Sequence, residues 1–149
     1  MPKSIEEYVS DARSGVEPAL ICRVPSGWVL LCNMQFLPGY CILAPDPVVP
    51  SINDLTRSQR LAFLADMVVV GDALLEVTGA YRINYGIMGN SDPALHAHIV
   101  PRYMSEPDDL RCGLPWTYPA PVIATRYFDR LRDRALMDQL AAAIQKLCA

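Results

Sequence analysis

The 149-residue sequence contains only two histidines, and they lie two positions apart, at His96 and His98. It also has no apolar run that approaches the length of about 20 residues needed to span a lipid bilayer. The first seven residues, MPKSIEE, contain no apolar segment of the kind found in secretory signal peptides. These absences predict a protein that is neither inserted in a membrane nor secreted.

An excess of positive charge is absent as well. The chain has 13 Lys and Arg residues against 16 Asp and Glu residues, for a formal net charge of −3. A long basic surface is the usual requirement for sequence-independent binding of DNA or RNA. We therefore expect no nucleic-acid partner, and we expect any anionic ligand to be held by local contacts.

The cysteines contain no CxxC pair, so neither a redox motif nor a paired-cysteine metal site is indicated. Most of them lie inside apolar segments, which is typical of reduced thiols in the core of a cytosolic protein. The cysteine pattern thus predicts a cytoplasmic location. The five residues are Cys22, Cys32, Cys41, Cys112 and Cys148.

Length and composition favour one globular domain. The chain is 52% hydrophobic and 19% charged, which excludes a disordered or low-complexity protein. A chain of this length buries roughly 68–70% of its unfolded surface when it folds. We expect residues 1–149 to form a single domain.

Two capping boxes mark the starts of predicted helices, one formed by Ser4 with Glu7 and the other by Thr56 with Gln59. Apolar residues at helical spacing follow the second box, and they recur near the C-terminus with Arg and Asp on the opposite face. The predicted helices cover residues 5–13, 56–79 and 128–147.

Short apolar segments bounded by turn residues predict strands. Pro25-Ser26-Gly27 predicts a hairpin turn, and the proline-rich segment 106–121 predicts an irregular loop. The pattern indicates an α+β fold with a mostly antiparallel sheet of about five strands, one long packing helix and a C-terminal helix. The predicted strands cover residues 19–24, 28–32, 40–44, 81–87 and 94–103.

The two histidines fall on one face of the last predicted strand. Successive side chains of a strand point to opposite faces, so Leu95, Ala97 and Ile99 face the core while His96 and His98 share the other face. Residues two positions apart along a strand are separated by about 7 Å, at roughly 3.3 Å of rise per residue. Such a pair can hold one small group between two imidazoles.

Three interpretations of this histidine pair compete. The first is that both are ordinary solvated strand residues, since short motifs have many false positives. The second is a metal site, whose further ligands would have to come from Asp92, Glu106 and Cys112, although their spacing matches no known metal motif. The third is nucleophilic catalysis, in which one neutral histidine attacks an electrophile and its neighbour binds or protonates it.

The sequence around the pair resembles a known family. The run ALHAHIVPR, residues 94–102, resembles the signature of the histidine triad (HIT) superfamily, His-φ-His-φ-His-φ-φ, often followed by Pro-Arg. In this register His96 matches the nucleophile and His98 the third histidine, whereas Ala94 stands where the first histidine would be. Because the nucleophile of the family donates to a backbone carbonyl at the first position, the resemblance implies that Ala94 supplies this partner.

Other segments resemble the family in the same order along the chain. The turn Pro38-Gly39-Tyr40 looks like its Pro-Gly-His turn with Tyr40 in place of histidine, and the resemblance covers about residues 19–103, with the loop and helix of 104–149 outside it. The resemblance implies a HIT-like domain with Asn33 as a ribose ligand and further nucleotide or phosphate contacts. The residues implied for these contacts are Asn84, Asn90, Ser91 and Arg102.

Several of these residues have structural alternatives. Asn33 and Asn90 are also typical turn formers. An arginine at a strand end, such as Arg102, is commonly solvated or in a salt bridge. Arg111 and Trp116 are expected to pack on the surface, with coverage of the pocket as the alternative. We expect Leu20 and Ile21 to pack in the core rather than line an adenine pocket.

The resemblance implies a metal-independent hydrolase or transferase that needs no cofactor. It would cleave at the α-phosphorus of dinucleoside polyphosphates or nucleoside phosphoramidates through a nucleotidyl-histidine intermediate on His96. The family also implies a homodimer. One alternative is a catalytically silent nucleotide-binding or interaction module, which the alanine at position 94 favours. The other is a metal-binding protein that uses both histidines.

Overall fold

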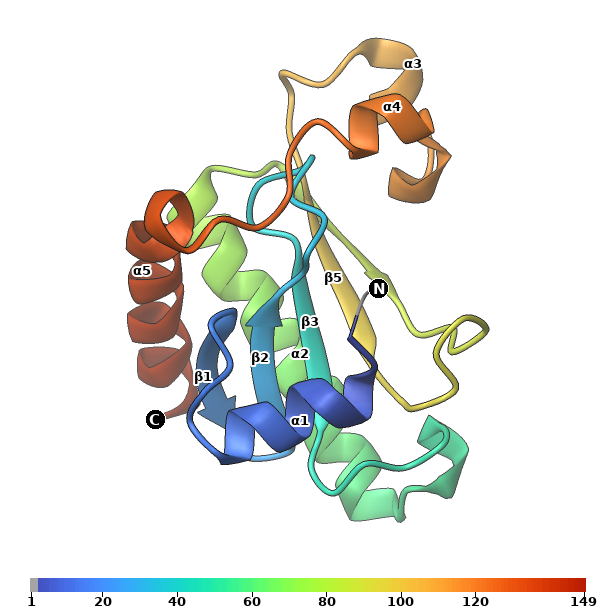
Figure 1. Cartoon of the computed structure of the whole chain (residues 1–149), viewed down its shortest axis with the longest axis vertical. Helices are drawn as coiled ribbons and strands as arrows, with labels where there is room; N and C mark the ends of the chain where they lie inside the picture. The colour runs from blue at the N-terminus through green and yellow to red at the C-terminus, as the bar shows by residue number, and fades with distance from the viewer. Residues whose placement is uncertain (1–2) are drawn as a thin grey trace.

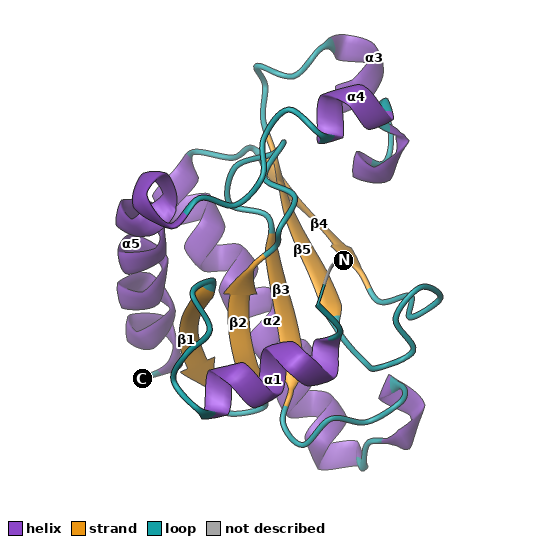
Figure 2. Cartoon of the chain, viewed as in Figure 1, coloured by secondary structure: helices purple, strands orange, loops and turns teal. Residues whose placement is uncertain are grey.

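The computed structural model describes residues 3–149, which fold around a five-stranded antiparallel sheet. The strand order is β1-β2-β3-β5-β4, and all four pairings are antiparallel (Figure 2). This confirms the predicted α+β class and the mostly antiparallel sheet. The strands are β1 (Leu20–Val24), β2 (Gly27–Leu31), β3 (Cys41–Pro45), β4 (Arg82–Gly86) and β5 (Ala97–Arg102).

Helices cover both faces of the sheet. The long helix α2 (Arg57–Thr78) and the C-terminal helix α5 (Arg130–Cys148) pack on one face, and α1 (Ile5–Arg13) crosses the other (Figure 1). Both predicted capping boxes are present, at Ser4 for α1 and at Thr56 for α2. The helix positions predicted from capping and periodicity are therefore confirmed.

The predicted irregular loop is the main difference from expectation. It contains α3 (Asp108–Arg111), the 3-10 turn η2 (Pro115–Thr117) and α4 (Ala120–Ile123), which project beyond one end of the sheet (Figure 1). A proline stands at or next to the start of each. Proline is preorganised for the first helical position, since its φ is fixed and it lacks the N–H that a helix start leaves unpaired.

The last strand is shorter than predicted. The N–H of Leu95 donates to the carbonyl of Val49, outside the sheet, at 2.8 Å, so the ladder with β3 begins only at Ala97. His98 therefore lies within β5, paired with Ile42, and His96 lies just before the strand.

The core has two layers, one on each face of the sheet. Leu95, Ala97 and Ile99 are buried against α2 and α5, as the alternation predicts. Val100, on the face of His98, is buried in the second layer with residues of α1. A shorter element, η1 (Ile52–Asp54), precedes α2.

Among residues 3–149, no helix combines the length and the apolar character that crossing a membrane requires.

Candidate active site

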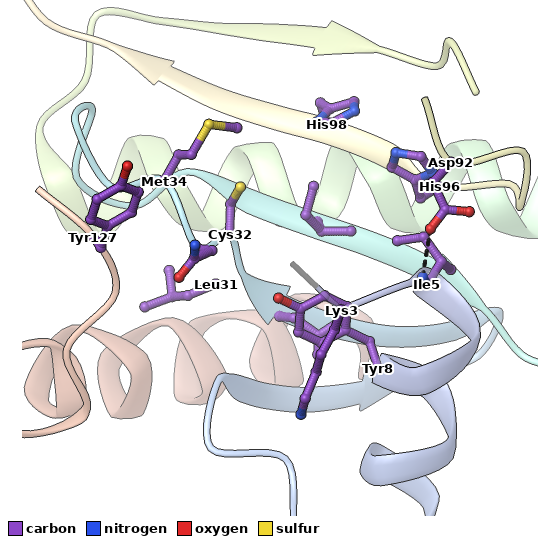
Figure 3. A pocket seen from close by; sticks show the side chains of 13 residues that line it. Lys3, Ile5, Tyr8, Leu31, Cys32, Met34, Asp92, His96, His98 and Tyr127 are labelled. Atoms are coloured by element: carbon purple, nitrogen blue, oxygen red, sulfur yellow. Dashed lines mark hydrogen bonds between the residues drawn. The ribbon is translucent and has the colours of Figure 1, made fainter. Parts of the chain in front are cut away.

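A cavity of about 690 Å³ opens on the face of the sheet that carries α1. Its volume lies within the range of roughly 300–1,000 Å³ that is usual for small-molecule sites. His96 and His98 lie at one end, and Met34 and Tyr127 at the other (Figure 3). The structure thus places both histidines in a space large enough for a nucleotide.

His96 is held by one backbone hydrogen bond. Its Nδ1 lies 2.8 Å from the carbonyl oxygen of Ala94, and its side chain is almost completely buried. A carbonyl oxygen only accepts, so in the neutral ring Nδ1 carries the proton and Nε2 has the lone pair. The expected carbonyl partner at position 94 is confirmed, and it does not depend on which side chain that position carries.

The ring of His98 lies against that of His96. The ring centroids are 4.8 Å apart and the planes are inclined by 68°, so the imidazoles are closer than the repeat along a strand. Burial, and secondarily the neighbouring His96, lowers the pKa of His98 to about 4. At neutral pH this ring is therefore uncharged and carries one proton.

Two further aromatic side chains, besides His96, lie against His98. The hydroxyl of Tyr40 lies 2.6 Å from Nδ1 of His98, and the Trp116 indole N–H donates to that hydroxyl at 3.1 Å. Trp116 approaches because β4 has Gly86 there, where a Cβ would lie 2.8 Å from the indole ring. Trp116 is half-buried and does not line the cavity, and the loop brings it next to the His98 ring, at a centroid distance of 5.5 Å.

Gln35, which sequence reasoning missed, shapes the turn that carries Tyr40. Its fully buried amide donates to the carbonyls of Cys32 and Tyr40, at 2.8 and 2.9 Å, and accepts from the N–H of Gly39 at 3.0 Å. Gly39 has a φ of +99°, which glycine adopts without strain. A glutamine within an otherwise apolar segment before Pro-Gly was the available signal.

Asn33 lines the cavity, as expected for a ligand of the sugar. Its carbonyl accepts from the N–H of Phe128 at 2.8 Å, and the N–H of Gln35 donates to the carbonyl of Arg126 at 3.0 Å. The segment before α5 thus pairs with residues 33–35 and brings Tyr127 to the cavity.

Asn90 and Ser91 are exposed on the turn before the histidines and do not line the cavity. The next residue, Asp92, does. Its carboxylate accepts from the N–H of Ile5 at 2.7 Å and from that of Ala94 at 3.0 Å (Figure 3). Asp92, a metal-ligand candidate in the sequence, joins the start of α1 to the segment that holds His96.

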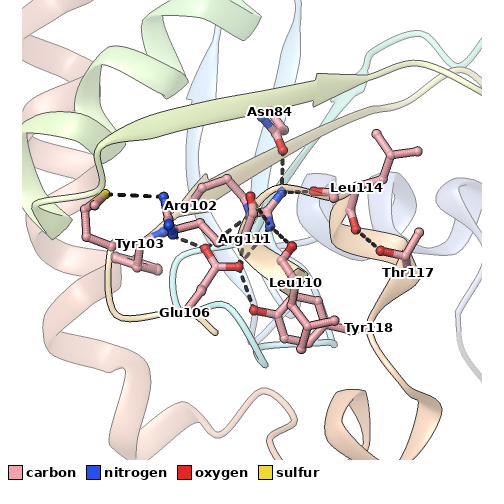
Figure 4. Close-up of polar contacts among 11 residues, drawn as sticks. Asn84, Arg102, Tyr103, Glu106, Leu110, Arg111, Leu114, Thr117 and Tyr118 are labelled. Atoms are coloured by element: carbon pink, nitrogen blue, oxygen red, sulfur yellow. Dashed lines mark hydrogen bonds and ion pairs between the residues drawn. The ribbon is translucent and has the colours of Figure 1, made fainter. Parts of the chain in front are cut away.

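Arg102 and Asn84 do not line the cavity, which corrects their expected contact with phosphate. Arg102 is 1% exposed and uses all its N–H groups within the protein (Figure 4). It pairs with Glu106 at 2.9 Å and donates to Asn84 Oδ1 at 2.8 Å. Its other acceptors are the carbonyls of Leu110, Arg111 and Gly113.

Glu106 completes this cluster on the loop. Burial favours its neutral form, but hydrogen bonds from Arg102, Tyr118 and the N–H of Tyr103 outweigh burial and hold the pKa of Glu106 below its usual value. The salt-bridge alternative for Arg102 is therefore correct. The cluster anchors the loop that carries Trp116. Arg111 pairs with Asp108 on the loop and does not line the cavity.

No family model matches the sequence. Over 107 residues the chain is 29% identical to a bis(5'-nucleosyl)-tetraphosphatase (asymmetrical) of Schizosaccharomyces pombe. The match covers 68% of this chain, and it spans only 57% of the length of that relative.

Solved structures give a broader match. A histidine triad protein from Marinobacter aquaeolei VT8 superposes with a TM-score of 0.72 at 22% identity, over 86% of this chain and 89% of that one. A hypothetical histidine triad nucleotide-binding protein from Sulfolobus tokodaii has the same TM-score at 14% identity, over 95% and 93% of the two chains. The chain has the HIT fold. At these identities the structural likeness is one of fold.

The two histidines lie at one end of the cavity, and no metal-ligand set is found there among the described residues. Within residues 3–149, no three His, Cys, Asp or Glu side chains are grouped closely enough to hold a metal ion. Glu106, one of the three candidates, is committed to Arg102.

We predict that His98 makes the folded state less stable in acid. Its pKa is about 4 in the folded protein, against about 6.5 when unfolded. Above pH 6.5 both states are neutral at this site, and below it the unfolded state binds the proton first. The free energy of unfolding should therefore fall as the pH drops from 6.5 through 4. Urea unfolding measures this free energy at each pH, and it should depend less on pH in His98→Asn than in the wild type. The same pH dependence in both proteins would contradict the low pKa of His98.

We predict that Arg102→Met lowers the free energy of unfolding by about 3–5 kcal/mol, because it leaves Glu106 and three carbonyls buried without their donor. Arg82→Met is the matched control, since Arg82 pairs with Arg102 across the strands but is exposed. This control should change stability by about 0.5 kcal/mol or less. Unchanged stability with weakened nucleotide binding in Arg102→Met would instead restore the phosphate role.

Proposed function

We propose that the chain is a HIT-type nucleotide hydrolase or nucleotidyltransferase acting at the α-phosphorus of dinucleoside polyphosphates or nucleoside phosphoramidates. One observation carries the proposal: Nδ1 of His96 is committed to the Ala94 carbonyl, so Nε2 is the free nucleophilic nitrogen of a histidine that lines a nucleotide-sized cavity. The partial match to a tetraphosphatase supports the same chemistry. We propose that residues 1–149 act as one HIT-like domain.

The reaction has two displacements. Nε2 of His96 attacks the α-phosphorus, and the bond from phosphorus to the leaving phosphate or amine breaks as the leaving group takes up a proton. The intermediate is a nucleotidyl group on His96. Water or another acceptor then attacks the phosphorus and loses a proton. The bond from phosphorus to Nε2 of His96 breaks, and a nucleoside monophosphate or its ester is released. A neutral imidazole needs no deprotonation before it attacks.

The residues around His96 supply positioning and hydrogen-bond donors. His98 lies beside it and donates to a nonbridging oxygen or to the leaving group. Asn33 binds the ribose, and Ser91 and Asn90 reach the phosphate from the exposed turn. Asn84 and Arg102 do not contact the substrate. They act indirectly, because Asn84 accepts a hydrogen bond from Arg102, which anchors the loop that carries Trp116.

A catalytically silent nucleotide-binding module is the second candidate. The observation that favours it is Ala94, because the position of the first histidine carries no imidazole. The exposed turn with Ser91 and the apolar cavity would serve binding equally well. The two candidates differ in turnover and in whether a covalent adduct forms.

We predict that wild-type protein releases AMP from adenosine phosphoramidate or diadenosine tetraphosphate, and that His96→Ala loses at least about 1,000-fold in rate. A chelator should leave the rate unchanged. Circular dichroism of the variant controls for folding. Binding without turnover or adduct in the wild type would favour the silent module, and loss of activity with chelator would favour a metal.

We also propose that the chain is cytoplasmic and forms a homodimer. Its cysteines are free thiols, and Cys22, Cys32 and Cys41 are buried. One face of α2 exposes an apolar row at helical spacing. The edge strand β4 carries the exposed Tyr85, and the exposed Tyr81 directly precedes it. Such a row is unusual on the surface of a monomer. Its residues are Leu61, Leu64, Val68 and Leu75.

We predict that Val68→Asp converts the dimer to a monomer, because a charge in the middle of the apolar row opposes burial. Light scattering coupled to size exclusion measures the mass. Leu131→Asp is the matched control, since Leu131 is 91% exposed on a different helix, α5. A wild-type mass of one chain would exclude the dimer, and dissociation by both variants would exclude the α2 face.

A further inference from the structure

Nδ1 of His98 faces a tyrosine hydroxyl that is itself hydrogen-bonded. The indole N–H of Trp116 has no acceptor capacity, so it donates to the Tyr40 oxygen. That oxygen has a single proton, which remains free to donate elsewhere. Its nearest nitrogen is Nδ1 of His98, at 2.6 Å. The three groups therefore form a chain with one direction, from indole to hydroxyl to imidazole.

The alternative acceptor for the Tyr40 proton is the Cys32 thiol. Sulfur is a weak acceptor, and an imidazole nitrogen is a strong one. Burial raises the pKa of Cys32 to about 11, so a thiolate does not compete at neutral pH. Burial also raises the pKa of Tyr40 well above its usual value, so the hydroxyl keeps its proton.

We propose that Tyr40 and Trp116 are positioning residues that hold His98 in the tautomer with its proton on Nε2. His96 has the opposite tautomer, because the Ala94 carbonyl takes its Nδ1 proton. The two rings then act differently at the same phosphorus: Nε2 of His96 attacks and Nε2–H of His98 donates. The catalytic consequence rests on the proposed function, whereas the tautomer is a property of the ligand-free protein.

The fold holds both positioning residues rigidly. Tyr40 is fully buried, and its turn is fixed by Gln35 and Gly39. Trp116 lies on the loop anchored by Arg102 and fits against Gly86. Tyr40 and Trp116 are 76 positions apart in sequence. His98 thus receives its support from a turn and a loop rather than from a side chain at position 94.

Long-range proton–nitrogen NMR of the ligand-free protein at pH 7 distinguishes protonated from bare ring nitrogens. We expect His98 with a bare Nδ1 and His96 with a bare Nε2. Tyr40→Phe should shift His98 to a mixture of tautomers and leave His96 unchanged. Trp116→Phe should have a smaller effect, because Tyr40 can still donate. A wild-type His98 protonated on Nδ1 would overturn the proposal.

Tyr118→Phe is the matched control, since it also removes a buried hydroxyl, but one that donates to Glu106 at 2.6 Å. It should leave the His98 tautomer unchanged. If it shifts the tautomer as much as Tyr40→Phe does, loop packing and not the Tyr40 hydroxyl is responsible. An unchanged tautomer in Tyr40→Phe would also overturn the proposal.

Kinetics provide the second readout. Tyr40→Phe should lower kcat by about 10- to 100-fold, because His98 would donate in only part of the molecules. KM should stay the same, since Tyr40 does not line the cavity. A change confined to KM would overturn the positioning role. If the wild type has no turnover, the proposed function fails while the NMR experiment still decides the tautomer.

Discussion

A neutral imidazole carries one proton on two nitrogens, and this constraint governs the site. The partner of one nitrogen decides what the other can do. His96 meets a carbonyl and is left with a lone pair at Nε2, whereas His98 meets the Tyr40 hydroxyl at Nδ1. Two identical side chains, 4.8 Å apart, therefore have different chemistry. The surrounding turn and loop serve largely to hold these two partners in place.

Positive charge has a structural use in this protein. Arg102 is buried and neutralised by Glu106, and its remaining donors hold the loop backbone. Lys3, at the edge of the cavity, pairs with Asp11 and Glu17. Imidazoles, an amide and hydroxyls therefore line the cavity together with the Asp92 carboxylate, which is consistent with the small negative net charge of the chain.

Local patterns predicted most of the fold and part of the site. The alternation around Ala97 placed both histidines on one face, and the capping boxes placed α1 and α2. The same reasoning put Arg102 at the phosphate, which was wrong, and did not predict the contacts of Trp116 with Tyr40 and His98. Sequence pattern shows that an arginine ends a strand, but not that Asn84 of β4 and four acceptor residues of the loop surround its guanidinium.

The sequence by itself determined most of the secondary structure and the shared face of His96 and His98, and its family resemblance implied the carbonyl partner at Ala94, because these depend on residues a few positions apart. The tertiary structure alone decided the partner of His98, the role of Gln35, and the burial and hydrogen-bond partners of Arg102. Each of these depends on which buried donor meets which acceptor across turns and loops. Such pairings are set by the packing of the whole chain, since a buried polar group must find its partner wherever the fold brings one.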